Sequence, residues 1–242
     1  MNKGDLIKQV AKVLAAEKNT QAAIDNVFSL LDSEFQGLDD SEKNEFIELL
    51  DDTEEKVKQL GDKDQDQWMS EIYLRKAVCA KGIFERQKEH FLWKQAYEYG
   101  LKSENNEVIF QSCHALGFDF YEFTRSIREI LEFQMDSIKA VCAQGTKIFT
   151  RLKLTGMNLF NFWRQIEFRR LSEHDLKAKK MVMDGAKSLE KADFDEERAA
   201  PIMIMLISKL YDFEDPCLEW AQHEAAILDI PIPDSIKRKI GT

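Results

Sequence analysis

The chain has 242 residues, of which 44% are hydrophobic and 32% are charged, and its formal net charge at pH 7 is −10. This balance is typical of a globular protein that buries a substantial core, and it excludes a disordered chain. No apolar run approaches the roughly 20 residues that a membrane-spanning helix needs. The negative net charge argues against general binding to nucleic acid.

Cysteine usage and the start of the chain bear on its location. Asp5, Lys8 and Lys12 interrupt the first apolar stretch, so no secretory signal is visible. The cysteines at 79, 113, 142 and 217 form no Cys-x-x-Cys pair and lie in apolar helical patterns. We interpret all of them as reduced, buried side chains. We therefore expect a cytoplasmic protein, or an effector exported without a cleaved signal.

The distribution of proline predicts the fold class. All four prolines lie in the last 42 residues, and none occurs in the first 200. Proline is kept out of helix interiors because it lacks a backbone donor and clashes with the preceding turn. Strand and hairpin signals are nearly absent. We predict an all-α protein of antiparallel helical hairpins, arranged as an irregular helical bundle or a helical array.

The N-terminal part, residues 1–61, is predicted to be a three-helix element, with helices at 5–16, 21–36 and 41–60. The third helix directs Phe46, Leu49, Leu50, Val57 and Leu60 inward and its acids outward. The candidate acidic docking face consists of Glu45, Glu48, Asp51, Asp52 and Glu55. A solvated helix face explains these acids, and a docking face for a basic partner is the alternative. Residues 62–66 contain no apolar side chain and are the predicted linker.

Residues 67–230 are predicted to form a larger helical array that is richer in aromatic residues. Its helices are expected near 67–87, 89–101, 105–121, 123–142, 146–171, 173–191, 196–212 and 215–228. The residues around Pro231 and Pro233 should be extended, because a residue that precedes proline avoids the α region. The tail, 231–242, should then contain a short helix at 234–240.

Small residues recur at a helical-hairpin period, since Gly82, Gly117 and Gly156 lie 35 and 39 residues apart. A repeated helical glycine marks close approach of two helices, because it costs about 1 kcal/mol against alanine. Residues 70–140 resemble a tetratricopeptide repeat, through Ala96-Tyr97-Glu98-Tyr99-Gly100-Leu101-Lys102 and Ala115-Leu116-Gly117-x-x-Phe120-Tyr121. The resemblance implies stacked helical hairpins and no ligand-binding residue. The chain lacks the closing proline of that family, and an irregular bundle is the alternative.

A second resemblance is confined to the N-terminus. The segment Met1-Asn2-Lys3-x-x-Leu6-Ile7-x-x-Val10-Ala11 resembles the start of HU-type DNA-bending proteins. An acidic block follows Phe35, where that family has a β-sheet and basic arms. Because those arms enter the minor groove in such proteins, the resemblance implies no shared DNA-binding function.

Residues 147–171 combine basic and aromatic side chains on one predicted helix. Its apolar face consists of Phe149, Leu152, Gly156, Leu159, Phe160, Trp163 and Ile166. The candidate partner-binding residues are Arg151, Lys153, Phe162, Arg164, Phe168, Arg169 and Arg170. Burial on two sides is one interpretation of this pattern. A surface for an acidic protein helix or an anionic membrane is a second, and stacking on single-stranded nucleic acid is a third.

Motifs that carry chemistry are absent from the sequence. None of the histidines at 90, 114, 174 and 223 forms a His-Glu-x-x-His motif, and there is no Gly-rich phosphate loop or Gly-x-Ser-x-Gly elbow. We therefore predict no metal site and no cofactor. We interpret His114, beside Cys113, as a packed core position, and we interpret Glu219 and His223 as a pair on the surface of one helix.

We hypothesise a non-enzymatic protein-interaction module, an adaptor or inhibitor whose partner is another protein. One alternative is a secreted bacterial effector or immunity-type protein that acts at an anionic membrane or on a toxin. A second alternative is a helical enzyme whose catalytic residues converge from distant helices.

Overall fold

The computed structural model describes residue 28 and residues 39–60, 65–123, 127–144, 148–165, 179–212 and 216–240. Helices and turns make up these ranges, which contain no strand, so the predicted all-α fold is confirmed. The chain divides into two compact units, Met1–Glu104 and Asn105–Thr242. The predicted helices at 5–16 and 21–36 lie outside the described residues, apart from Phe28, and so does the HU-like segment.

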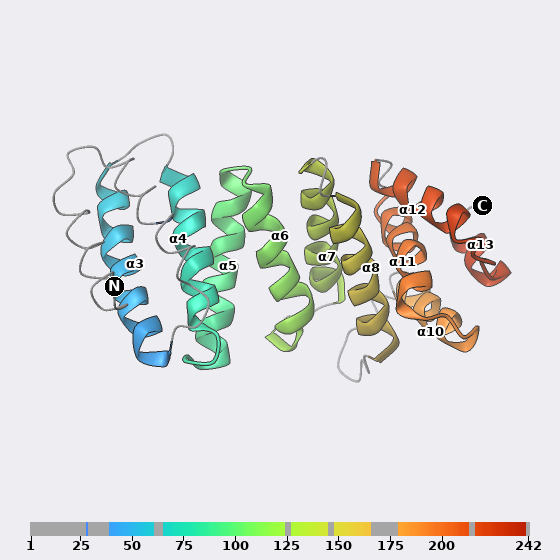
Figure 1. Cartoon of the computed structure of the whole chain (residues 1–242), viewed down its shortest axis with the longest axis horizontal. Coiled ribbons are helices and arrows are strands. Elements are labelled where there is room, and N and C mark those ends of the chain that lie inside the picture. Colours follow the sequence, from blue (N-terminus) through green and yellow to red (C-terminus); the bar gives the residue numbers. More distant parts are fainter. Residues whose placement is uncertain are drawn as a thin grey trace. The chain divides into compact units, whose positions relative to one another are not determined.

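The first unit contains three described helices, α3 (Asp40–Leu60), α4 (Gln65–Ala80) and α5 (Arg86–Lys102), and α4 packs against both others (Figure 1). A capping box begins α3. The backbone N–H of Asp39 donates to Glu42 and that of Glu42 donates to Asp39, each at 2.9 Å. These two bonds satisfy donors that the first turn of a helix otherwise leaves open.

The core of the first unit follows the predicted apolar spacing. Its buried members are Phe28, Phe46, Ile47, Leu49, Leu50, Val57, Trp68, Met69, Ile72 and Cys79. Arg75 of α4 holds its guanidinium 4.1 Å from the centre of the Phe28 ring. The division between the units falls after Glu104. The last two residues of the predicted linker at 62–66, Gln65 and Asp66, belong to α4, and α4 packs against α3 within the first unit.

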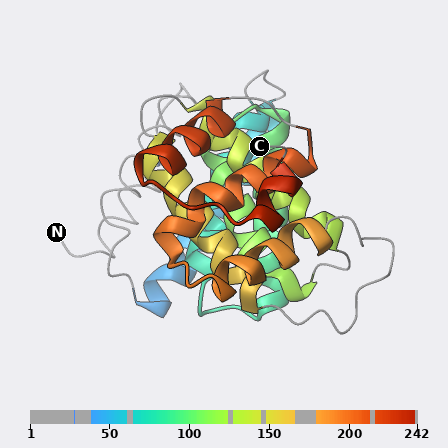
Figure 2. The same cartoon turned by 90° about the vertical axis from the view of Figure 1, so that its right-hand side faces the viewer.

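The second unit is built around α11 (Glu196–Leu210), which packs against helices on several sides (Figures 1 and 2). Its neighbours are α7 (Ile127–Ala143), α8 (Ile148–Gln165), α10 (Asp184–Lys191), α12 (Pro216–Ile227) and α13 (Asp234–Ile240). The unit begins with α6 (Asn106–His114) and the short helical turns Ala115–Asp119 and Tyr121–Phe123, and Lys179–Met183 forms a further turn before α10. The extended segment before α13 and the bounds of α13 are as predicted.

A buried polar junction links three elements of the second unit. Trp163 of α8 donates its indole N–H to the Gln134 side-chain oxygen of α7 at 2.8 Å. The amide nitrogen of Gln134 in turn donates to the backbone oxygen of Gly117 at 3.0 Å. Since buried polar groups are costly unless they are hydrogen-bonded, this chain of two bonds stabilises one arrangement of the core.

Close helix approach is confirmed at two of the three recurring glycines. A Cβ at Gly156 would lie 2.5 Å from the backbone oxygen of Ala200 on α11. A Cβ at Gly117 would lie 3.1 Å from the Gln134 side chain on α7. Gly82 differs, because it has φ +81° in the turn after α4 and nothing within 4 Å of an added Cβ. Its role is conformational.

The prediction that all four cysteines are reduced is wrong for two of them. Cys142 on α7 and Cys217 on α12 are joined in a disulfide, although they lie 75 residues apart in the sequence. The fold returns α12 to the end of α7, and no local spacing announces this proximity. Cys79 and Cys113 are free and buried, as predicted. Burial raises the pKa of Cys79 to about 12 and raises the pKa of Cys113 well above its ordinary value.

Candidate functional site

A groove in the second unit brings the first turns of α8 together with α12. Its cavity measures about 540 Å³ and is lined by Phe149, Thr150 and Lys153 of α8 and by Trp220, His223, Glu224 and Ile227 of α12. The spacings within each set, i, i+1, i+4 and i, i+3, i+4, i+7, each gather on one face of a helix. We call this site the α8–α12 groove.

Large apolar side chains are exposed along the α8–α12 groove. Phe149 is 62% exposed and Ile227 is 64% exposed, whereas Trp220 is only 7% exposed. The Phe149 and Trp220 rings stack with centroids 6.5 Å apart and planes 25° from parallel. Exposed aromatic and aliphatic side chains gathered over a buried indole are typical of an interaction site.

The predicted apolar face of α8 therefore holds for most of its length and fails at its start. Leu152, Leu159, Phe160 and Trp163 are fully buried, whereas Phe149, predicted on the same apolar face, is exposed. None of the described helices buries Phe149, and the groove lies at this position instead.

The charges at the α8–α12 groove are only partly matched. Lys153 forms an ion pair with Glu197 at the start of α11, with 2.9 Å between its ammonium nitrogen and the carboxylate. The side chains of His223 and Glu224 make no hydrogen bond or ion pair with the residues that the structure describes. The groove thus presents an apolar floor with an unmatched carboxylate at its side.

The described basic residues of the predicted partner-binding patch each meet an acid of the same unit. Arg151 lies 2.6 Å from the Glu107 carboxylate, and Arg164 lies 3.4 Å from the carboxylate of Glu196. Together with Lys153, they pair with glutamates 32 to 44 residues away in the sequence. The sequence does not show this pairing, because no acid lies between Arg151 and Arg164 and the partners lie on α6 and α11.

Phe162 belongs to a partly buried aromatic cluster. Its ring meets the rings of Phe118, Tyr121 and Trp163 edge-on, with centroids 5.2 to 5.8 Å apart. His114 packs between Phe110 and Phe118, and desolvation lowers its pKa although Asp119 opposes this shift. The packed position expected for His114 is therefore present. Phe168, Arg169 and Arg170 lie outside the described residues, and a partner-binding role for the patch stays a prediction.

All five residues of the acidic docking face are exposed on α3, namely Glu45, Glu48, Asp51, Asp52 and Glu55. Asp51 pairs with Lys76 of α4 at 2.6 Å, and Glu55 pairs with Lys58 at 3.0 Å. Two of these acids therefore also serve the internal structure of the first unit. A basic partner for this face stays a prediction.

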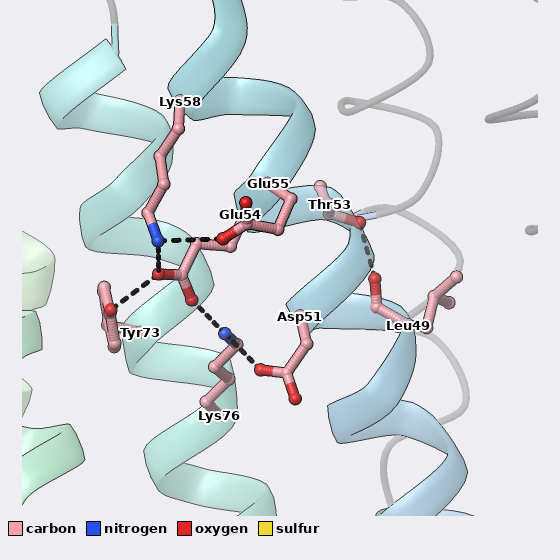
Figure 3. A network of polar contacts seen from close by, with 8 residues as sticks. All are labelled: Leu49, Asp51, Thr53, Glu54, Glu55, Lys58, Tyr73 and Lys76. Atoms are coloured by element: carbon pink, nitrogen blue, oxygen red, sulfur yellow. Dashed lines mark hydrogen bonds and ion pairs between the residues drawn. The ribbon is translucent and has the colours of Figure 1, made fainter.

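A polar network behind the acidic face joins α3 to α4 and centres on Glu54 (Figure 3). The Glu54 carboxylate accepts hydrogen bonds from Tyr73 at 2.8 Å and from Lys76, and it pairs with Lys58 at 2.7 Å. The Lys76 side chain is only 3% exposed and is also paired with Asp51. A buried lysine between two carboxylates satisfies its charge internally.

The network shifts the ionisation of its members. Desolvation by burial acts to raise the pKa of Glu54, but hydrogen bonds from Lys58, Lys76 and Tyr73 outweigh it and hold the pKa below its ordinary value. Burial, followed by the hydrogen bond to Glu54, raises the pKa of Tyr73. These shifts keep Glu54 ionised and Tyr73 protonated, so the network acts as a clamp between two helices.

No protein-family model matches this chain, and no curated protein or solved structure matches it either. Among the described residues, no group of three or more His, Cys, Asp or Glu side chains could hold a metal ion. None of the described helices is both long and apolar enough to cross a bilayer.

Sequence reasoning did not identify the α12 residues as a site and interpreted His223 only as half of a surface pair with Glu219. The buried face of this helix consists of Cys217, Trp220, Ala221 and Ala225, with partly buried Leu218 beside it. Ile227 lies seven residues after Trp220, at the edge of that face, and is nevertheless exposed, as is Leu228 after it. Two such residues at the end of a helix were the one signal available.

Proposed function

We propose that this chain is a non-enzymatic protein-interaction module and that the α8–α12 groove receives an apolar segment of a partner protein. One observation carries the proposal: Phe149 and Ile227 are exposed side by side with buried Trp220 in a single cavity. Exposed large apolar side chains that flank a well-packed aromatic residue form the energetic centre of many protein interfaces.

The two-helix construction of the groove favours a helical partner segment. Amphipathic helices dock in grooves between helices and insert apolar side chains spaced by three, four and seven residues. The unmatched Glu224 carboxylate favours a partner that carries lysine or arginine beside those apolar anchors, because complementary charge raises association rate and specificity. The partner class is therefore an amphipathic helix with a basic edge.

The test compares substitutions inside and outside the groove. Phe149→Asp and Ile227→Asp each place a charge in the cavity, and Leu154→Asp is the matched control, because Leu154 is 52% exposed on α8 but does not line the groove. Tagged proteins are used to capture partners from native cells, and affinity for the partner is then measured by calorimetry. We expect both groove variants to bind the captured partner at least about 30-fold more weakly, a hot-spot loss, and the Leu154 variant to bind normally.

A partner that binds all three variants equally well would refute the groove as the docking site. Binding that is lost in the Leu154 variant as well would also count against it, since the effect would then not depend on the cavity. Circular dichroism of each variant confirms that its helices are retained.

A further inference from the structure

The α12 wall of the groove is held by few large side chains. Of its buried residues, Cys217, Ala221 and Ala225 are small, and only Trp220 is large. Because hydrophobic stabilisation scales with buried apolar area, this face contributes less than a face of leucines would. No ion pair joins α12 to another element within the described ranges.

The disulfide compensates for this weak anchoring at the first turn of α12. Cys217 lies one turn before Trp220, and its bond to Cys142 ties that turn to the end of α7. The two Cα atoms lie 6.1 Å apart, within the range that a disulfide spans without movement of the backbone. The cross-link joins residues far apart in the sequence, and a disulfide that closes a long loop restricts the unfolded chain most.

The two cysteines differ in their burial. Cys217 is fully buried, whereas Cys142 is half-buried, so Cys142 is the side from which an external thiolate would approach the bond. The remaining cysteines, Cys79 and Cys113, are buried and free, and their raised pKa values keep them as unreactive thiols. Exchange is therefore directed to a single pair.

We propose that the Cys142–Cys217 pair is a reversible thiol switch. The oxidised pair holds the α12 wall of the groove against α7, and reduction of the pair makes that wall more mobile. A protein dithiol of the Cys-x-x-Cys class is the reductant. Its first thiolate attacks the Cys142 sulfur, forms a mixed disulfide and expels the Cys217 sulfur, which takes up a proton. Its second thiolate then displaces Cys142, so two electrons and two protons pass to the pair and the reductant becomes a disulfide.

The consequence for binding rests on the proposed function, whereas the switch itself does not. Four of the seven groove residues belong to α12, so a loosened α12 presents a less ordered surface. Ordering that surface on binding lowers affinity. An oxidising compartment would therefore favour the binding-competent form and a reducing one the weaker form.

The test uses the full chain equilibrated in oxidised or reduced glutathione, with dithiothreitol as a second reductant. Alkylation in denaturant followed by mass spectrometry should find two modified cysteines in the oxidised protein and four in the reduced one. Hydrogen exchange of peptides covering 216–227 should be about tenfold faster or more after reduction, while peptides of α3 and α4 change less than twofold.

The double variant Cys142→Ser/Cys217→Ser serves as the matched control. It should exchange fast over 216–227 under both conditions, and reduced wild type supplies the same comparison without substitution. Four modified cysteines in the oxidised protein, or α12 exchange that changes less than twofold once the bond is cut, would overturn the switch. Because hydrogen exchange needs no partner, failure of the switch is distinguishable from failure of the groove variants to lose binding.

Discussion

Replacing Gly156 with alanine tests how closely α8 and α11 approach. The added Cβ would lie 2.5 Å from the backbone oxygen of Ala200 and 2.8 Å from its carbonyl carbon and Cβ. Real Cβ atoms do not come this close to a backbone, so one helix must move away from the other. Moving α8 would loosen the contacts of Phe160 and Trp163, both fully buried in the same core.

Two opposing effects set the magnitude. Alanine gains about 1 kcal/mol over glycine as a helix former. Overpacking a close contact costs about 1–3 kcal/mol, and here the obstacle is backbone, which cannot rotate aside, so the upper end applies. We expect a net loss of about 2 kcal/mol in the free energy of unfolding and a melting temperature lower by about 6 °C.

Urea titration followed by circular dichroism measures this loss, and two other glycines serve as controls. A Cβ at Gly185 would meet the flexible end of the Leu206 side chain at 2.6 Å, so Gly185→Ala should cost less than Gly156→Ala. Gly82 has open space but φ +81°, so Gly82→Ala should cost about 1 kcal/mol through strain alone. A Gly156→Ala protein as stable as wild type or more so would show that helix propensity outweighs the contact and would refute the reasoning.

Two further predictions concern the network around Glu54. Because the folded pKa of Glu54 is lowered, the unfolded chain binds a proton at Glu54 first as the pH falls, so the contribution of Glu54 to stability is complete above about pH 4.5 and is lost as the pH falls through the folded pKa. Urea unfolding midpoints measured across this range should therefore fall less steeply with falling pH in Glu54→Gln than in the wild type. Midpoints that fall equally steeply in both proteins would contradict the assignment. Lys76→Met should lower the free energy of unfolding by about 3 kcal/mol, because it leaves the buried Glu54 carboxylate without its buried cation. Lys58→Met removes an exposed lysine that pairs with the same carboxylate and should cost less than about 1 kcal/mol. Equal losses in the two variants would mean that burial of the lysine does not decide the effect.

Most of the helical framework was predictable because local apolar spacing encodes it. The helix predicted at 89–101 is α5, the one predicted at 196–212 is α11, and the short helix at 234–240 is α13. Capping residues reinforced these positions, since Asp195 accepts a hydrogen bond from the Arg198 backbone at 2.8 Å. Such signals depend on residues within one or two turns and are visible without tertiary structure.

Helix ends were harder to place, for a conformational reason. The residues with positive φ after α5, α10, α11 and α12 are Glu104, Asp193, Asp212 and Asp229. Glycine is the usual residue at a left-handed helix terminus, and aspartate is tolerated there because its short side chain bonds locally. An acidic residue at the end of an amphipathic stretch is indistinguishable by pattern from a solvated helix position.

The ion pairs of α8 lay beyond the reach of sequence reasoning for a different reason. The run of cations from Arg151 to Arg164 suggested a free basic surface, yet Glu107, Glu196 and Glu197 come from elements that fold back onto α8. Opposed charge blocks in a sequence do not reveal which acid meets which base. Pairing depends on which helices are neighbours, and this topology is not a local property.

The α8–α12 groove shows the limit most clearly. A helical wheel identifies which side of α8 is apolar, and Phe149 belongs to that side together with Leu152 and Phe160. Whether each turn of that side is covered depends on the lengths and ends of other helices, so Phe149 is 62% exposed while Leu152 and Phe160 are fully buried. The same apolar pattern thus produces core at one end of a helix and an interaction surface at the other. Ile227, at the last position of α12, owes its exposure to the same cause.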